Sequence, residues 1–519
     1  MNSTFEMVAK TFQGLENVLA GELESLGASD VVPGKRMVAF RGDLAMLYKA
    51  NMCCRTALRI LKPFYTFEAS DADELYSKVK EYDWETLLSA ERTFSIDTVA
   101  FSDEFKHSQF VTYRVKDAIV DWFRDRMGGD KRPGVRLDGA DIMINVHING
   151  RNVTLSLDSS GESLHKRGWR VASTEAPINE VLAAGIILMS GWDGSTPFVD
   201  PMCGSGTFAI EAAMIAAGIQ PGVYRRRFAF EGWPDFNAEL LDEIYNDDSR
   251  ERTPEFPILA CDISPKAIAI ARENAKNAGV ERYITFEQKS ISKWEEAPLP
   301  AGTLVTNPPY GKRIGADDMN ALYSSIGTVL KHVFKGWHAW IIGYNDEYFH
   351  EIGLAPSQKV AVNNGGLECE LREYVIFEGS KRDFRAAGGR IKEEKEPERR
   401  KERPARNRDE RGGRGERAPF KGKRDERGGK RGERPERGGR PERGERAPFK
   451  GKRGERPERR GEEGRRHRDE IEELGGRLRL RPAYPERKPS LGADKEIVIN
   501  RPAWRKRKKD IDNNENTNQ

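Results

Sequence analysis

The spacing of hydrophobic residues predicts small units of mixed helix and strand in the first 160 residues. Apolar side chains recur at helical spacing in three segments, Glu16–Leu26, Asp73–Leu88 and His107–Met127. Short apolar runs predict strands at Met37–Phe40 and Thr93–Val99. Residues 142–148 and 152–157 alternate around Asn149-Gly150, which favours a β-hairpin. This mixture indicates an α+β architecture.

From about residue 180 onward, strand and helix patterns alternate regularly. Strands are predicted at Thr196–Val199, Ile258–Cys261, Ile284–Phe286, Thr303–Val305 and Ala339–Ile342. Helices are predicted at Glu180–Met189, Thr207–Ala217, Pro265–Ala278 and Ala321–Val333. Such alternation is typical of an α/β domain with a parallel sheet and helices on both faces. Gln358–Val362 and Leu371–Phe377 flank Asn364-Gly365-Gly366, which predicts a hairpin at the sheet edge.

The hydrophobic pattern stops near residue 390, and composition changes there. Residues 391–470 hold 31 Lys and Arg against 20 Asp and Glu, so the net charge of +4 combines a mildly acidic body with a basic tail. Within this tail, residues 415–424 repeat at 444–453, and a basic cluster follows at Trp504–Lys509. Because the repeat has one aromatic residue and little else to bury, we expect residues 381–519 to be disordered.

Several classes of protein are disfavoured by what the sequence lacks. The longest apolar stretch is Val181–Met189, whereas a membrane span needs about 20 residues. The first residues do not resemble a signal peptide, so we expect a cytoplasmic protein without membrane contact. The five cysteines form no C-x-x-C pair and match no histidine spacing, so we interpret them as buried apolar residues and expect no metal site.

A glycine-rich turn follows the first strand of the α/β domain. Asp200 precedes Gly204 and Gly206, whose missing side chains let a ligand approach backbone N–H groups at a helix start. The letters G-S-G-T-F-A also satisfy a dinucleotide fingerprint, so a nicotinamide oxidoreductase is one alternative. That fingerprint includes an acidic residue about 20 positions after the glycines, at the end of the second strand. Here the second strand ends at Asp262, much further from Gly206. Asp200 better suits a ligand with a positively charged amino-acid end.

A second motif follows the fourth strand of this domain, where Thr306 is succeeded by Asn307-Pro308-Pro309-Tyr310. Two prolines fix the loop, and the Asn307 side-chain oxygen beside the Pro308 carbonyl makes two acceptors for one planar NH₂ group. Tyr310 offers a ring on which an extruded base can stack. Alone the motif fits an ordinary turn. Next to the glycine-rich turn, it favours methyl transfer to an exocyclic amine.

The two motifs resemble those of class I S-adenosylmethionine-dependent amino methyltransferases. Longer stretches resemble bacterial large-subunit ribosomal RNA guanine-N2 methyltransferases that carry an N-terminal THUMP domain: residues 157–170, 175–180, 228–234 and 364–371, with Phe110–Asp121 similar to the RNA-facing part of THUMP. The resemblance covers roughly residues 1–380. It implies a ferredoxin-like region over 1–60, THUMP over 61–160 and a Rossmann-like methyltransferase domain over 161–380, followed by the tail.

The resemblance also implies a set of site residues. S-adenosylmethionine is expected to contact Asp200, Pro201, Cys203, Gly204, Ser205, Gly206, Asp262, Ser290 and Asn307. The target base is expected to contact Asn307, Pro308 and Tyr310. Ser290 departs from the acidic residue usual near the adenine amine, and no second methyltransferase domain follows, so we expect a single activity.

Contacts to RNA are expected where cations or aromatic rings lie near these regions. The candidates are Phe110, Lys116, Lys166, Arg167, Arg225, Arg227, Lys312 and Arg313. The basic tail is expected to add salt-sensitive, non-specific affinity.

The sequence thus predicts methylation of a guanine N2 amine in 23S ribosomal RNA or a large-subunit precursor. An adenine-N6 enzyme acting on RNA or DNA is the first alternative, because the motif suits either amine. A non-catalytic RNA-binding assembly factor is the second.

Overall fold

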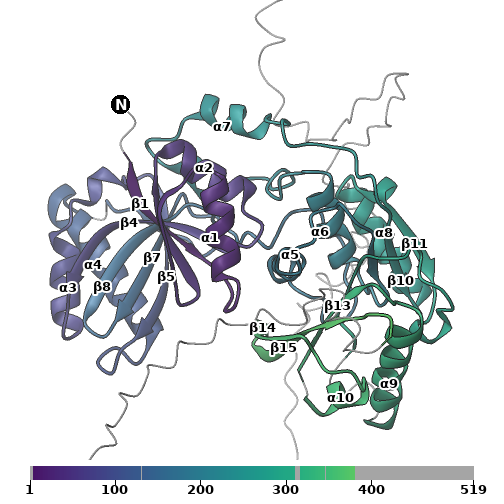
Figure 1. Cartoon of the computed structure of the whole chain (residues 1–519). Coiled ribbons are helices and arrows are strands. Elements are labelled where there is room, and N and C mark those ends of the chain that lie inside the picture. Colours follow the sequence, from purple (N-terminus) through teal and green to yellow (C-terminus); the bar gives the residue numbers. More distant parts are fainter. Residues whose placement is uncertain (1–3, 130, 310–315, 345, 380–519) are drawn as a thin grey trace, which may run out of the picture. The chain divides into compact units, whose positions relative to one another are not determined.

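The structure, a computed structural model, describes residues 4–129, 131–309, 316–344 and 346–379. These residues build two β-sheets, of eight and seven strands. In Figure 1 the first sheet lies in the purple and blue part of the chain and the second in the teal and green part. The tail and three predicted site residues, Tyr310, Lys312 and Arg313, lie outside the described residues.

The eight-stranded sheet contains the strands of the first 160 residues, in the order β2-β3-β1-β4-β8-β7-β5-β6. Their bounds are β1 Phe5–Lys10, β2 Ser29–Gly34, β3 Met37–Gly42, β4 Arg59–Glu68, β5 Thr93–Phe101, β6 Gly134–Val135, β7 Ile142–Asn149 and β8 Asn152–Asp158. Alternate residues of β1 and β3 enter the core, as Met7 and Ala9 of β1 do. The expected hairpin around Asn149 is confirmed, because β7 and β8 pair antiparallel across it.

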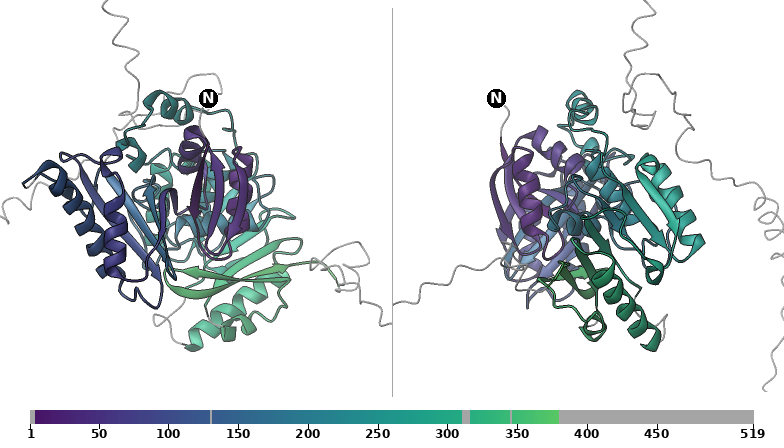
Figure 2. Two further views of the ribbon diagram at one scale, coloured as in Figure 1. Left: turned by 90° about the vertical axis from the view of Figure 1, so that its left-hand side faces the viewer. Right: turned by 45° about the vertical axis from the view of Figure 1, so that its right-hand side comes forward.

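Among the described residues of this half, four α-helices accompany the strands: α1 Glu16–Ser25, α2 Leu44–Cys53, α3 Ala72–Glu81 and α4 Ser108–Met127. Figure 2 shows α3 and α4 lying side by side along the strands. The helix predicted over Asp73–Leu88 is too long, because α3 ends at Glu81 and Tyr82 leaves helical geometry. A separate 3₁₀ turn, Trp84–Thr86, follows it.

Strand β4 joins the two N-terminal regions into one sheet. It pairs with β1 on one side and with β8 on the other. The domain boundary expected at residue 60 lies inside this strand. The sequence pattern missed β1 and β4, and Pro63 interrupts the ladder of β4 with a register shift.

The seven-stranded sheet has the order β11-β10-β9-β12-β13-β15-β14. Its strands are β9 Phe198–Asp200, β10 Ile258–Asp262, β11 Ile284–Gln288, β12 Thr303–Thr306, β13 His338–Gly343, β14 Gln358–Asn364 and β15 Leu367–Val375. Strands β9 to β13 are parallel, and the β14–β15 hairpin closes one edge antiparallel to β13. The parallel sheet and its edge hairpin are confirmed.

In the described part of this half, six α-helices accompany the sheet: α5 Glu180–Met189, α6 Thr207–Ala216, α7 Ala238–Tyr245, α8 Pro265–Asn277, α9 Ala316–His332 and α10 Asp346–Glu351. Buried residues of α6 and α8 belong to one apolar core and those of α9 to another. The sheet is therefore covered on both faces, as expected for a Rossmann-like domain.

The segment between α6 and β10, which includes α7, packs against α2 of the N-terminal sheet. The Phe230 ring stacks on Tyr48 with centroids 4.2 Å apart. The backbone N–H of Gly222 donates to the Met52 carbonyl at 2.9 Å, and a Cβ at Gly222 would approach that carbonyl oxygen to the same distance. Glycine is therefore required for this close approach.

Burial of the cysteines follows the expectation for four of the five, and Cys53 is half-buried. Among the helices of the described residues, none is long and apolar enough to cross a membrane.

Candidate active site

The glycine-rich turn connects β9 to α6 by a left-handed path. Gly204 and Gly206 have φ values of +52° and +84°, which side chains other than glycine rarely adopt. A Cβ at Gly206 would lie 2.9 Å from the Cβ of Ala271 on α8. The turn therefore depends on glycine both for its backbone conformation and for its packing against α8.

Asp200 ends β9 and is almost completely buried, with 1% of its surface exposed. Burial raises its pKa to about 8, and the nearby Asp262 carboxylate adds to the increase. One carboxyl oxygen accepts a 3.3 Å hydrogen bond from the Met202 N–H. A cationic ligand group would relieve the cost of ionising this carboxyl, which agrees with the predicted partner, an amino-acid ammonium.

Asp262 ends the neighbouring parallel strand, β10. Its Oδ2 accepts from the Gly204 N–H at 2.9 Å and its Oδ1 accepts from the Ser264 N–H at 2.9 Å. Each carboxylate oxygen can accept a second hydrogen bond. Asp262 is thus held in place by the backbone and keeps capacity for ligand hydroxyls.

Asn307 follows β12, the fourth strand of the domain in chain order. Its Oδ1 atom is buried and has no hydrogen-bond partner among the described residues. A buried polar atom without a partner costs roughly 1–3 kcal/mol, and the Asn307 side chain also lines a cavity at these strand ends. Its Oδ1 is the atom that the sequence analysis assigned to the target amine.

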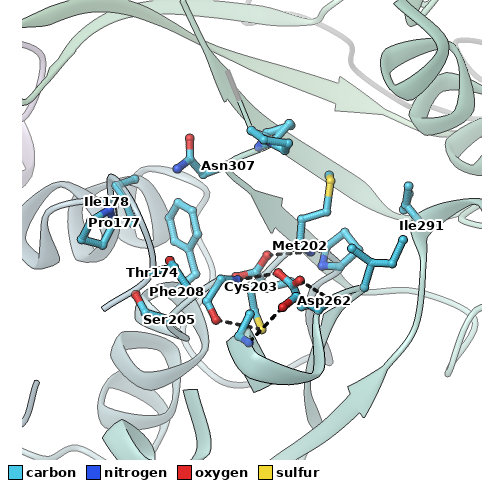
Figure 3. A pocket seen from close by; sticks show the side chains of 18 of the residues that line it. Thr174, Pro177, Ile178, Met202, Cys203, Ser205, Phe208, Asp262, Ile291 and Asn307 are labelled. Atoms are coloured by element: carbon cyan, nitrogen blue, oxygen red, sulfur yellow. Dashed lines mark hydrogen bonds between the residues drawn. The ribbon is translucent and has the colours of Figure 1, made fainter. Parts of the chain in front are cut away.

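A cavity of about 650 Å³ brings these strand ends together. Figure 3 shows the side chains of Asn307, Met202 and Asp262 at its wall. Of the predicted site residues, those that line it are Asp200, Pro201, Cys203, Gly204, Ser205, Asp262, Ser290, Asn307 and Pro308. Gly206 is not among the described residues that line the cavity, because it packs against Ala271 of α8.

Sequence reasoning missed part of the wall. Residues 174–178 cover the cavity from the segment before α5, with Ala176 at a positive φ of +48°. Ile263 lines the cavity and is 70% exposed. An apolar residue immediately after the acidic end of a strand is a signal that the sequence offered. Residues 175–180 were singled out only as a stretch that resembles the family, and nothing in their local pattern assigned them to the cavity.

Two predicted RNA contacts are wrong, because Arg167 and Arg225 are buried, with exposed fractions of 2% and 4%. Arg167 donates to Glu211 Oε1 at 3.2 Å and to the Arg55 carbonyl at 2.6 Å. Arg225 instead donates to four backbone carbonyls, those of Ser160, Glu162, Ser163 and Lys166. Both cations stabilise the chain between β8 and α5 and do not face RNA.

The remaining described candidates stay at the surface. Phe110 is 55% exposed on the first turn of α4, and Arg227 is also exposed. The ammonium of Lys116 lies 2.7 Å from Asp117, and that of Lys166 lies 3.0 Å from Glu162. Such exposed ion pairs are weak and can exchange partners for phosphates.

Family models match three consecutive parts of the chain. They are the RlmL ferredoxin-like domain over residues 6–61, the THUMP domain over 69–158 and the RMKL-like methyltransferase domain over 167–373. The Rossmann-like sheet with its glycine-rich turn, joined to THUMP, defines a class: the THUMP-containing methyltransferases.

Sequence relatives described as RNA methyltransferases place the chain more narrowly within this class. The chain is 40% identical over 372 residues to a "Putative RNA methyltransferase" of Synechocystis sp., covering 71% of this chain and 96% of the relative. It is 39% identical over 390 residues to the ribosomal RNA large subunit methyltransferase K/L of Syntrophotalea carbinolica, covering 73% of this chain. The chain spans 54% of that enzyme's length.

Solved structures agree with the sequence relatives. A protein described as "a putative methyltransferase complexed with SAH", where SAH is S-adenosylhomocysteine, superposes with a TM-score of 0.65 at 31% identity, covering 73% of this chain and all of that one. A predicted N6-adenine-specific DNA methylase from Listeria monocytogenes gives 0.65 at 30% identity, with coverages of 72% and 97%. The chain belongs to the S-adenosylmethionine-dependent RNA methyltransferase family with an RMKL-like methyltransferase domain.

Proposed function

We propose that this protein methylates the exocyclic N2 amine of a guanine in large-subunit (23S) ribosomal RNA. The observation that carries the proposal is that Asn307 lines the same cavity as the glycine-rich turn, while its buried Oδ1 atom has no hydrogen-bond partner among the described residues. The reaction would take place in the cytoplasm, on free RNA or on a ribosomal precursor.

The cavity fits S-adenosylmethionine by the chemistry of its walls. Asp200 suits the ammonium of an amino-acid end, and Asp262 keeps acceptor capacity for ribose hydroxyls. Ser290 also lines the cavity, and its hydroxyl lies 3.0 Å from that of Ser292. If Ser290 donates to Ser292, its oxygen can accept a hydrogen bond from an adenine amine. When bound, the cofactor supplies a methyl group activated by a sulfonium.

The chain's own contribution to catalysis is orientation of the amine. Asn307 Oδ1 and the Pro308 carbonyl oxygen would each accept one hydrogen bond from the NH₂ group. This arrangement turns the nitrogen lone pair out of conjugation with the base and toward the methyl donor. No strong base is required to start the reaction, because the nitrogen attacks as a neutral amine. The methylated nitrogen then carries one proton too many, which is acidic and is released to water.

RNA binding is assigned to the N-terminal sheet and its neighbourhood. Exposed Phe110, Lys166 and Arg227, together with half-buried Lys116, remain the proposed contacts, through stacking and phosphate pairing. Choice of large-subunit ribosomal RNA rests on the name of the K/L relative.

A second candidate is methylation of an adenine N6 amine. It is favoured by the predicted N6-adenine-specific DNA methylase among the structural neighbours, and by a pair of acceptors that does not distinguish the amines of the two bases.

Incubation with labelled S-adenosylmethionine and unmodified large-subunit RNA, followed by nucleoside analysis, tests these proposals. N2-methylguanosine is the expected product. N6-methyladenosine would keep the mechanism and change the substrate. Cofactor binding without label on RNA or on precursor particles would favour a non-catalytic assembly factor.

A further inference from the structure

Arg170 links the segment before α5 to the glycine-rich turn. Its guanidinium donates from Nη1 to Ser205 Oγ at 2.8 Å and from Nη2 to Thr207 Oγ1 at 2.8 Å. Its Nε donates to Glu180 Oε1 at 2.6 Å. The Arg170 and Glu180 side chains are 19% and 7% exposed, so this fork is held largely away from water.

The direction of these hydrogen bonds determines which hydrogen-bonding capacity remains free on the Ser205 and Thr207 hydroxyls. A guanidinium only donates, so both hydroxyl oxygens act as acceptors and their protons must point elsewhere. Ser205 and Thr207 are each 2% exposed, and both line the cavity. Across the described ranges, neither proton has an acceptor. Two buried donors at a cavity wall, backed by a cation, match an anionic ligand group.

We propose that the Ser205 and Thr207 hydroxyls form a carboxylate subsite and that Arg170 is the residue that orients them. The proposal rests on the proposed function, because the ligand is the amino-acid end of the cofactor. Asp200 lines the same cavity and serves the ammonium of that end. The ammonium of the amino-acid end would thus face the Asp200 carboxyl, and its carboxylate would face the Ser205 and Thr207 hydroxyls.

Glu180 makes this orientation specific to arginine. It begins α5, whose cap, Asn179, accepts from the Val181 N–H at 2.9 Å, so the carboxylate is fixed to a helix start. With Nε held by Glu180, the two Nη atoms point to Ser205 and Thr207 at the same time. A lysine keeps the charge but lacks the planar fork, so it cannot hold both hydroxyls and the carboxylate in one plane.

The test compares two ligands that differ only in the carboxylate, S-adenosylhomocysteine and its decarboxylated form, by isothermal titration calorimetry on the full chain. We expect Arg170→Lys to weaken S-adenosylhomocysteine about 10- to 100-fold and to leave the decarboxylated ligand nearly unchanged. The ratio of the two affinities is the readout, since a general loss of structure would weaken both ligands.

Arg252→Lys is the matched control. Arg252 also forks, donating to the Ala216 and Asp193 carbonyls at 2.7 Å each, but beyond the other end of α6. Its replacement should leave the ligand ratio unchanged. If Arg170→Lys does not fold, the double variant Ser205→Ala, Thr207→Val should lose the same discrimination. Equal weakening of both ligands, or no weakening, overturns the carboxylate subsite. Failure of the wild type to bind S-adenosylhomocysteine overturns the proposed function itself.

Discussion

The backbone N–H of Gly204 donates to Asp262 Oδ2 at 2.9 Å, which ties the glycine-rich turn after β9 to the end of β10. The side chain that is expected to bind ribose therefore also holds the turn that is expected to bind the amino-acid end. Disturbing the turn should affect the whole cofactor site. The next glycine, Gly206, gives a way to do so without removing a ligand contact.

We expect Gly206→Ala to destabilise the protein and to weaken S-adenosylhomocysteine. The new Cβ would have an unfavourable φ of +84° and would approach Ala271 Cβ to 2.9 Å. Together these effects cost roughly 2–4 kcal/mol. Gly139→Ala is the control, because Gly139 also has a positive φ, +66°, but has open space around it. Thermal unfolding and calorimetry measure both effects, and equal losses for the two variants would contradict this account.

Asn307→Ala should separate catalysis from cofactor binding. Loss of the Oδ1 acceptor leaves one N–H of the target amine without a hydrogen-bond acceptor, so we expect kcat to fall roughly 100- to 1,000-fold. The affinity for S-adenosylhomocysteine should change little, because the cofactor's charged groups meet Asp200 and Asp262. Single-turnover transfer with equilibrium binding measures the two quantities. Unchanged turnover would remove Asn307 from the mechanism.

Asp200 should make stability depend on pH in a defined direction. Its pKa is raised to about 8 in the folded state, whereas an unfolded Asp titrates near ~4. Between these values the folded protein holds a proton that the unfolded chain has released, so stability falls as pH rises from about 4 to about 8. Asp200→Asn removes this cost.

The thermal midpoint of Asp200→Asn relative to wild type should therefore rise steadily from pH 5 to pH 8, measured without ligand. Asp193→Asn is the control of opposite sign. Hydrogen bonds from Ser195 lower the pKa of Asp193, so its replacement brings no gain over this range. A difference between Asp200→Asn and wild type that is constant with pH would show that the Asp200 carboxyl does not titrate as described.

The sequence allowed Asp200, Asp262 and Asn307 to be brought together because each follows a short buried strand in a regular alternation. The carboxyl ends of parallel strands lie at one edge of a sheet, so chain order alone placed these residues around one cavity. Arg170 could not be found in this way. Its hydroxyl partners lie 35 and 37 residues further along the chain, in the glycine-rich turn and at the first residue of α6, so no local pattern links them to Arg170.

Charge runs were the least informative signals. Arg225 and Arg227 lie two positions apart in one basic triplet, yet Arg225 is buried on backbone carbonyls and Arg227 is exposed. Nothing local distinguishes them, because burial of Arg225 depends on carbonyls of residues 160–166. The same limit explains the wrong assignment of Arg167.

Arg167 and its neighbour Lys166 should respond very differently to substitution. Arg167 pairs with Glu211 where both side chains are at most 1% exposed, so Arg167→Met leaves an uncompensated buried charge and should cost roughly 3–5 kcal/mol. Lys166 pairs with Glu162 at the surface, and Lys166→Met should cost less than about 1 kcal/mol. Urea unfolding measures both, and similar losses would contradict the buried network.

The Phe110 ring should contribute to RNA binding by stacking on a base. This ring is 55% exposed near the start of α4, in the segment that resembles the RNA-facing part of THUMP. Stacking of a base on an aromatic ring contributes roughly 1–3 kcal/mol, so Phe110→Ala should weaken binding to large-subunit RNA about 5- to 150-fold. Stacking releases few counterions, so the slope of affinity against salt should stay the same.

Phe256→Ala serves as its control. Phe256 is 37% exposed and precedes β10, at the end of the strand opposite to Asp262. Its loss should not change RNA affinity. Lys116→Gln completes the comparison, because loss of a phosphate contact should weaken binding and reduce the salt slope by about one. Equal effects of the Phe110 and Phe256 variants in filter binding would exclude stacking at α4. The RNA site would then have to be sought among the exposed cations alone.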